Sequence, residues 1–249
     1  MNTTKIPDGL CILEGNDPLR SLIDFVFPSN PNVFHNQAIL SPTMEIVEEL
    51  NDYVLSLFPG ESKVYLSADT PFNFDEEDEL EGDLFRPQLL NEIKSSNIPK
   101  YRLKLKVGVP IILLRNLDST KGLSIGTRMQ VDYLGNHFIT ATVIDGKNIG
   151  DKVVIPKIDM VPKDSDLPFK FQRRQFPVCL CFAMTIKRSQ GLSFSKVGLY
   201  LPWSVSTLGQ VHVAVTELST TNDLKMLILD DEGKPCNTTR NVVFPEGFY

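Results

Sequence analysis

The sequence predicts an α/β protein that is interrupted by a small inserted β-barrel. Near the start of the chain, a short apolar stretch over residues 38–43 is followed by helical spacing of apolar residues over 44–58. Residues 100–160 hold several short alternating stretches separated by Gly, Asn or Asp, which is typical of a small all-β unit. Apolar strands and helical spacing return after residue 169, so we expect the β-rich part to lie inside the α/β part.

The α/β part is predicted in two pieces, residues 1–99 and 169–249. In the first piece Thr43 follows the predicted strand and is a candidate N-cap for the helix over 44–58. Residues 67–99 are polar, acidic and interrupted by proline, which predicts a long loop with a short helix near residues 88–94. The second piece is predicted to contain a buried strand over 176–186, a strand over 196–202, a helix over 207–218 and a last strand over 224–229.

The inserted part is predicted to span residues 100–168. It opens with period-two alternation from Tyr101, and three further alternating stretches follow, each bounded by a turn residue. In such a strand Lys100, Arg102, Lys104 and Lys106 face one way, either as the wet side of a half-buried strand or as secondary contacts for nucleic acid.

Composition excludes several classes of protein. No run of about 18 apolar residues occurs and the first ten residues have no apolar core, so neither a membrane span nor secretion is expected. The four cysteines, at 11, 179, 181 and 236, form no C-x-x-C pair and no Cys/His cluster, so no metal site is expected. Cys179 and Cys181 alternate in a predicted strand and should share one face as ordinary thiols.

The charge is unevenly distributed along the chain. The formal net charge is −6, yet residues 93–117 and 167–216 contain cations and no acid, while residues 75–83 concentrate the acids. The two acid-free stretches could form a local positive surface for phosphate. The alternative is that their cations are solvated tips of strands.

Three stretches carry a specific resemblance: "LKLKVGVPIILLRNLDSTKGLSIGTRM", "FPVCLCFAMTIKRSQGLSFSKVGLYLP" and "GQVHVAV". Together they resemble the C-terminal half of PIF-type DNA helicases, and most nearly those associated with Helitron transposons. The resemblance implies a second RecA-like helicase domain, of the P-loop NTPase-type fold, with an inserted barrel of the Src-homology-three type. It also implies an ATP-dependent 5′ to 3′ DNA helicase family, an intracellular and nuclear location, and roles in DNA repair and telomere maintenance.

The phosphate-binding motif of the family's first domain does not occur in these 249 residues. Gly146-Lys147 and Gly233-Lys234 are not followed by Ser or Thr. Asp230 and Asp231 follow an apolar strand, but the resemblance implies only a closing strand there. We therefore expect that ATP and Mg²⁺ bind only with a first RecA-like domain, which a separate chain could supply, and that this chain alone does not hydrolyse ATP.

The stretch from Ala183 to Gly191 follows the family pattern Ala-Met-Thr-Ile-Asn-Lys-Ser-Gln-Gly. The resemblance implies that Thr185 contacts the DNA backbone. It assigns the turn that faces the nucleotide to Ser189, Gln190 and Gly191. Lys187 and Arg188 depart from the pattern but remain suited to phosphate, either as DNA contacts or as a tolerated change on the surface.

A second matching stretch, "GQVHVAVTEL", follows the family pattern Gly-Gln-x-Tyr-Val-Ala-Leu-Ser-Arg. By this resemblance Gln210 faces the nucleotide and His212, in place of Tyr, is a candidate DNA contact. Glu217 stands where the family has its arginine finger, which stabilises charge on the γ-phosphate. A carboxylate at this position repels phosphate. We therefore expect strongly reduced ATPase activity even when a first RecA-like domain is supplied.

Further candidates for DNA contact are Thr43, Arg173 and Arg174. Trp203, Phe169 and Phe171 could stack on bases, although core packing is the favoured interpretation for each. The expected function is therefore the C-terminal part of a PIF-type helicase that binds single-stranded DNA. The alternatives are a non-catalytic interaction or regulatory module and a degenerate remnant of a transposon-derived helicase.

Overall fold

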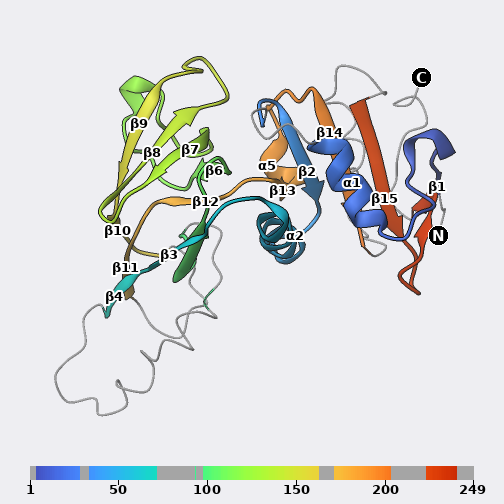
Figure 1. The fold of residues 1–249 in the computed structure, drawn as a ribbon, viewed down its shortest axis with the longest axis horizontal. Helices are drawn as coiled ribbons and strands as arrows, with labels where there is room; N and C mark the ends of the chain where they lie inside the picture. The colour runs from blue at the N-terminus through green and yellow to red at the C-terminus, as the bar shows by residue number, and fades with distance from the viewer. Residues whose placement is uncertain are drawn as a thin grey trace, which may run out of the picture. The chain divides into compact units, whose positions relative to one another are not determined.

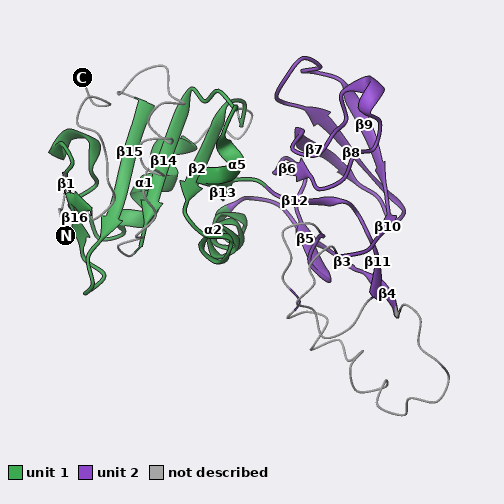
Figure 2. Cartoon of the chain, turned by 180° about the vertical axis from the view of Figure 1, so that it is seen from behind, with its two compact units in different colours: residues 1–57, 181–249 green, residues 58–180 purple. Residues whose placement is uncertain are grey.

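A computed structural model describes residues 4–28, 34–71, 93, 98–162, 171–202 and 223–239. The chain forms two compact units, one from residues 1–57 with 181–249 and the other from residues 58–180 (Figure 2). The inserted unit is thus longer than the predicted 100–168. The physical reason is strand pairing, because strands on both sides of that range pair inside the inserted unit.

Unit 1, residues 1–57 with 181–249, is built on a five-stranded sheet (Figure 1). In spatial order its strands are β13 (Ala183–Thr185), β2 (Gln37–Ser41), β14 (Lys196–Leu201), β15 (Leu224–Leu229) and β16 (Pro235–Cys236). The first four are parallel and β16 is antiparallel to β15. Strands β2 and β14 are buried along most of their length, as is usual for parallel strands covered on both faces.

Helix α1 (Pro18–Val26) packs on this sheet. It begins at Asp17, whose side chain accepts a hydrogen bond from the N–H of Arg20 at 2.9 Å, and Pro18 occupies its first turn. The helix crosses β14 at Gly198, where an added Cβ would lie 2.7 Å from Val26 Cγ2. Glycine therefore sets how closely this helix approaches the strand.

Helix α2 (Met44–Leu57) follows β2 and contacts β2 and β13. Thr43 Oγ1 accepts a hydrogen bond from the N–H of Ile46 at 3.5 Å, which confirms the predicted N-cap. The other described elements of unit 1 are short: η1 (Asp8–Leu10), α5 (Ile186–Ser189), and the paired strands β1 (Thr4–Lys5) and β17 (Thr238–Thr239).

In its described residues, unit 2 (residues 58–180) consists of β-strands and one 3₁₀ turn, η2 (Ser119–Lys121). Its main sheet is antiparallel, in the order β12 (Val178–Leu180), β6 (Pro110–Leu113), β7 (Arg128–Leu134), β8 (Phe138–Val143) and β9 (Lys152–Pro156). A second sheet holds β10 (Ile158–Met160), β11 (Phe171–Gln175) and β4 (Ala68–Pro71), and β3 (Lys63–Leu66) pairs with β5 (Arg102–Leu105). The described part of unit 2 is thus a set of short strands, and the predicted inserted barrel stays a prediction.

The predicted single strand over 176–186 is wrong. Its first part is β12 in unit 2 and its last part is β13 in unit 1, and the boundary between the units falls after Leu180. Cys179 therefore lies in β12, half-buried, whereas Cys181 is buried beyond the end of that strand. A continuous apolar run gives no sign of where the chain leaves one sheet for another.

Candidate nucleic-acid and nucleotide interface

The carboxyl ends of β13, β2 and β14 meet at one edge of the sheet in unit 1. Thr185, the last residue of β13, lies opposite Ser41, the last residue of β2. Ser41 Oγ donates a hydrogen bond to the carbonyl oxygen of Tyr200, near the end of β14, at 3.0 Å. Ligands of open α/β sheets bind outside the carboxyl ends of the strands, so this edge is the candidate site.

The α5 segment extends from the end of β13 at this edge. Thr185 is buried, and its Oγ1 accepts a hydrogen bond from the N–H of Arg188 at 3.3 Å. Ser189 is fully buried and its Oγ donates to the carbonyl oxygen of Ile186 at 2.8 Å. Both hydroxyls therefore stabilise the turn itself, and the roles predicted for them toward DNA and nucleotide stay predictions.

The residues of this segment that reach solvent are Lys187, Arg188, Gln190 and Gly191. Lys187 is exposed and Arg188 is half-buried. Gln190 and Gly191 are exposed, and Gly191 has φ +81° with no heavy atom within 4 Å of where a Cβ would lie. Glycine at this conformation leaves room for a ligand to approach the backbone.

Helix α2 begins at the same edge, because Thr43 follows Ser41 by two residues. The N–H groups of the first turn of a helix lack partners within the helix and attract anions. Thr43 satisfies one of these groups through its side chain. Thr43 and the α5 segment thus follow the carboxyl ends of two adjacent parallel strands, β2 and β13.

Asn51 of α2 is a residue of this region that sequence reasoning missed. Its carboxamide is buried and bonds both main-chain groups of Ala183: Nδ2 donates to the oxygen at 3.1 Å, and Oδ1 accepts from the N–H at 2.9 Å. The signal in the sequence was a single amide on the apolar face of the predicted helix, beside Val47, Leu50 and Val54.

Tyr200, at the carboxyl end of β14, contributes a neutral phenol. Burial, and secondarily the negative charge of Glu49, raises the pKa of Tyr200 above its ordinary value. The side chain therefore stays protonated at neutral pH and adds no negative charge to the edge.

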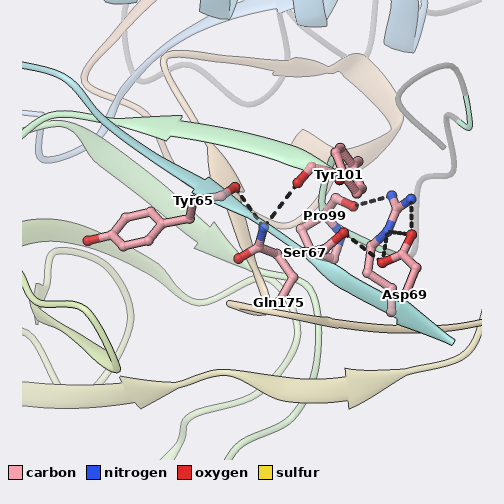
Figure 3. Close-up of polar contacts among 7 residues, drawn as sticks. Tyr65, Ser67, Asp69, Pro99, Tyr101 and Gln175 are labelled. Atoms are coloured by element: carbon pink, nitrogen blue, oxygen red, sulfur yellow. Dashed lines mark hydrogen bonds and ion pairs between the residues drawn. The ribbon is translucent and has the colours of Figure 1, made fainter. Parts of the chain in front are cut away.

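Arg173 does not fit the predicted role of a DNA contact, because its side chain is completely buried in unit 2. Its guanidinium pairs with Asp69, with Nη2 2.8 Å from Oδ2, and its Nη1 donates to the carbonyl oxygen of Pro99 at 3.0 Å. Ser67 Oγ also donates to Asp69, at 2.6 Å, and Gln175 bonds the carbonyl oxygens of Tyr65 and Tyr101 (Figure 3). A side chain with no exposed surface cannot reach a phosphate, so the DNA contact predicted for Arg173 is wrong.

The other cations predicted in unit 2 have different environments. Arg174 is exposed and pairs with Asp159 on β10, with Nη1 3.3 Å from Oδ2. Arg102 and Lys104 lie on the exposed side of β5, whereas Lys106 is buried and donates to the carbonyl oxygen of Phe58, so the four predicted cations do not share one wet face. Phe171 is fully buried, which confirms the core interpretation for this residue.

Several predicted residues lie outside the described part of the chain. They are Gln210, His212 and Glu217 of the second matching stretch, Trp203 and Phe169, the predicted helix near 88–94 and the acidic run at 75–83.

Within the described ranges, no group of three or more His, Cys, Asp or Glu side chains is arranged to hold a metal ion. Asp230 follows β15, but its Oδ1 accepts hydrogen bonds from the N–H groups of Glu232 and Lys234 at 2.9 and 2.8 Å. It closes the turn between β15 and β16. The nucleotide-facing role expected of Gln190 and Gly191 stays a prediction.

Comparison with known proteins relates the chain to one family. Residues 88–134 match the family "DNA helicase Pif1, 2B domain". The chain is 27% identical over 192 residues to the ATP-dependent DNA helicase PIF1 of Xenopus laevis, and 26% identical over 186 residues to that of Danio rerio. Each alignment covers 74% of this chain and 26% of the relative, so the chain spans about a quarter of the length of these curated relatives.

Solved structures share the fold. A crystal structure of the Pif1 helicase from Candida albicans has a TM-score of 0.59 at 21% identity, covering 89% of this chain and 52% of that one. A structure of Bacteroides Pif1 bound to single-stranded DNA has a TM-score of 0.54 at 23% identity, covering 85% and 45%. Over the part of the chain that the structure describes, no helix combines the length and apolarity needed to cross a membrane.

Proposed function

Taking the chain as part of a PIF-type DNA helicase, the family to which it is related in sequence and fold, we propose that it supplies the second RecA-like half of such an enzyme. In this proposal unit 1 binds single-stranded DNA through its phosphates at the carboxyl edge of the sheet. Unit 2 is proposed as the inserted barrel of the Src-homology-three type. The proposal rests on the position of the α5 segment. This segment follows β13 and carries Lys187 and Arg188 at the edge of the sheet where α2 begins.

The chemistry of this edge suits a phosphate chain. Two adjacent cations follow β13, and no Asp or Glu occurs from residue 167 to 216. The first turn of α2 adds partial positive charge at Thr43, which the carboxylate of Glu45 in the same turn partly offsets. Lys187 offers a mobile point charge and Arg188 a planar fork of donors, so the contacts should be independent of base sequence.

The same edge is proposed as one side of an ATP cleft. Gln190 and Gly191 would face the nucleotide, and ATP with its Mg²⁺ would supply the energy of translocation in the complete enzyme. The phosphate-binding motif would have to come from another domain, in the same or a separate chain, because these residues do not contain it. A nuclear location and roles in DNA repair or telomere maintenance follow from the family alone and are part of the proposal.

The test is fluorescence anisotropy of a labelled single-stranded oligonucleotide, titrated with the chain over a range of salt concentrations. For single strands, the slope of log affinity against log salt falls by about 0.7 for each phosphate contact removed. The double variant Lys187→Gln/Arg188→Gln should therefore bind more weakly and lower this slope by about 1.4.

The matched control is Lys196→Gln/Lys225→Gln, which removes the same charge at the amino ends of β14 and β15, the opposite edge of the sheet. It should leave the salt slope nearly unchanged. Equal effects of the two double variants would assign the binding to net charge rather than to the α5 segment. No binding by the folded wild-type chain at low salt would refute the proposal.

One feature favours a second candidate function, a non-catalytic interaction or regulatory module. Glu217 carries a negative charge where the family pattern has its arginine finger, which opposes catalysis. A chain that binds no oligonucleotide but associates with a P-loop-bearing helicase domain in sedimentation experiments would support this candidate.

A further inference from the structure

We propose that Asn51 is a positioning residue for the interface, because it holds the strand that leads into the α5 segment. This inference rests on the proposed function and concerns the same edge of unit 1. Asn51 lies on a helix face that is otherwise apolar and is only 6% exposed. A buried amide must find hydrogen-bond partners, and both of its partners are main-chain groups of one residue, Ala183.

Within the described part of the chain, Asn51 lies on the side of β13 where a further strand would pair. β13 is the outermost strand of the five and pairs with β2 on one side. The carbonyl oxygen of Phe182 accepts from the N–H of Ile39 on β2, and main-chain groups of successive residues in a strand point to opposite sides. The N–H and C=O of Ala183 therefore point away from β2, and the carboxamide satisfies both of these buried groups.

This bond connects the two parts of the interface. Thr185, two residues after Ala183, ends β13 and caps α5. Asn51 belongs to the helix that begins after Thr43 at the same edge. By joining α2 to β13, Asn51 sets the distance between the start of α2 and the cations Lys187 and Arg188. Binding atoms must be held to within about 0.5 Å for full effect.

The test is Asn51→Asp, measured by oligonucleotide anisotropy at pH 8 and pH 5 and expressed relative to wild type at each pH. An ionised carboxylate can accept from the N–H of Ala183 but repels its carbonyl oxygen. A protonated carboxyl group can donate to that oxygen and restores both bonds. The variant should bind about tenfold more weakly at pH 8 and recover toward wild type at pH 5.

The other titratable groups near Asn51 are the same in the variant and in wild type, so their effects cancel when the two affinities are compared at each pH. The strands β13 and β2 carry no titratable side chain. The charged or titratable groups of the neighbouring helices, present in both proteins, are Glu45, Glu48, Glu49, Asp52 and Tyr53 of α2 and Lys187 and Arg188 of α5.

The control is Leu22→Ala, which removes a fully buried side chain of α1 in the same unit. It destabilises unit 1, but its affinity relative to wild type should be the same at both pH values. A folded Asn51→Asp protein that binds like wild type at pH 8, or that is equally weak at both pH values, overturns the role of Asn51.

Amide hydrogen exchange of the wild-type chain decides the question if the variant does not fold. The N–H of Ala183 should be as protected as that of Ile39, which bonds within the sheet; fast exchange at Ala183 overturns the inference. A wild-type chain that binds no oligonucleotide refutes the proposed function, and the exchange measurement then supports or overturns the bond to Asn51 by itself.

Discussion

Arg173 and Arg174 are neighbours in sequence with opposite physical situations. Arg173 is completely buried against Asp69, which is also buried, while Arg174 and its partner Asp159 are largely exposed. A buried charge is stable only with its partner, whereas an exposed pair is screened by water. Arg173 therefore belongs to the stability of unit 2 rather than to ligand binding.

Replacing Arg173 by Met should destabilise unit 2 by about 3–5 kcal/mol, because Asp69 is left as an unpaired buried charge. Arg174→Met should cost at most about 1 kcal/mol. The measurement is urea unfolding together with amide exchange in peptides from β4 and β11. The double variant Arg173→Met/Asp69→Leu should be milder than Arg173→Met; equal costs for all three variants would contradict this account.

At the scale of elements, the packing of α1 on β14 depends on one missing side chain. Gly198 lies beneath Leu22 and Val26, and a Cβ there would be 2.7 Å from Val26 Cγ2 and 3.0 Å from Leu22 Cδ1. Both neighbours are buried and have little room to move. An added methyl group must therefore push the helix away from the strand.

We expect Gly198→Ala to destabilise unit 1 by about 1–3 kcal/mol through overpacking. Gly9→Ala is the control, since nothing lies within 4 Å of a Cβ at this position, and it should change stability by less than about 0.5 kcal/mol. Thermal unfolding of the two variants checks the difference. An unchanged melting temperature for Gly198→Ala would mean that α1 is free to shift.

At the scale of the whole molecule, two compact units occur in a chain that spans about a quarter of its curated relatives. In the proposed function, unit 1 supplies one side of the ATP cleft, and another domain must supply the phosphate-binding motif. We expect the chain alone to hydrolyse ATP no faster than a protein-free blank, with or without single-stranded DNA. A coupled assay of ADP release measures this.

With a P-loop-bearing domain supplied, Glu217→Arg should raise the hydrolysis rate, by up to about 10³–10⁵ if a complete arginine finger is restored. Glu232→Arg makes the same change of charge on an exposed turn and should leave the rate unchanged. Turnover by the unmodified chain alone would show that the proposed division of the cleft is wrong.

Much of the local structure could be predicted from sequence. Helix α2 and strands β2, β14 and β15 lie within a residue or two of their predicted bounds, because periodicity and capping are local properties. Helix α1 was missed although Asp17-Pro18 is a recognisable start. The order of Thr185 to Gly191 identified the segment that the structure places at the carboxyl end of β13, next to β2.

Tertiary structure decided which polar groups are available for binding. Arg173 meets a partner 104 residues away, and Asn51 meets one 132 residues away. It also decided that one apolar run supplies strands to two units. By itself, the sequence determined an α/β chain with a β-rich insertion and one cationic turn. Burial and distant pairing depend on which segments meet in space, and periodicity along the chain does not contain that information.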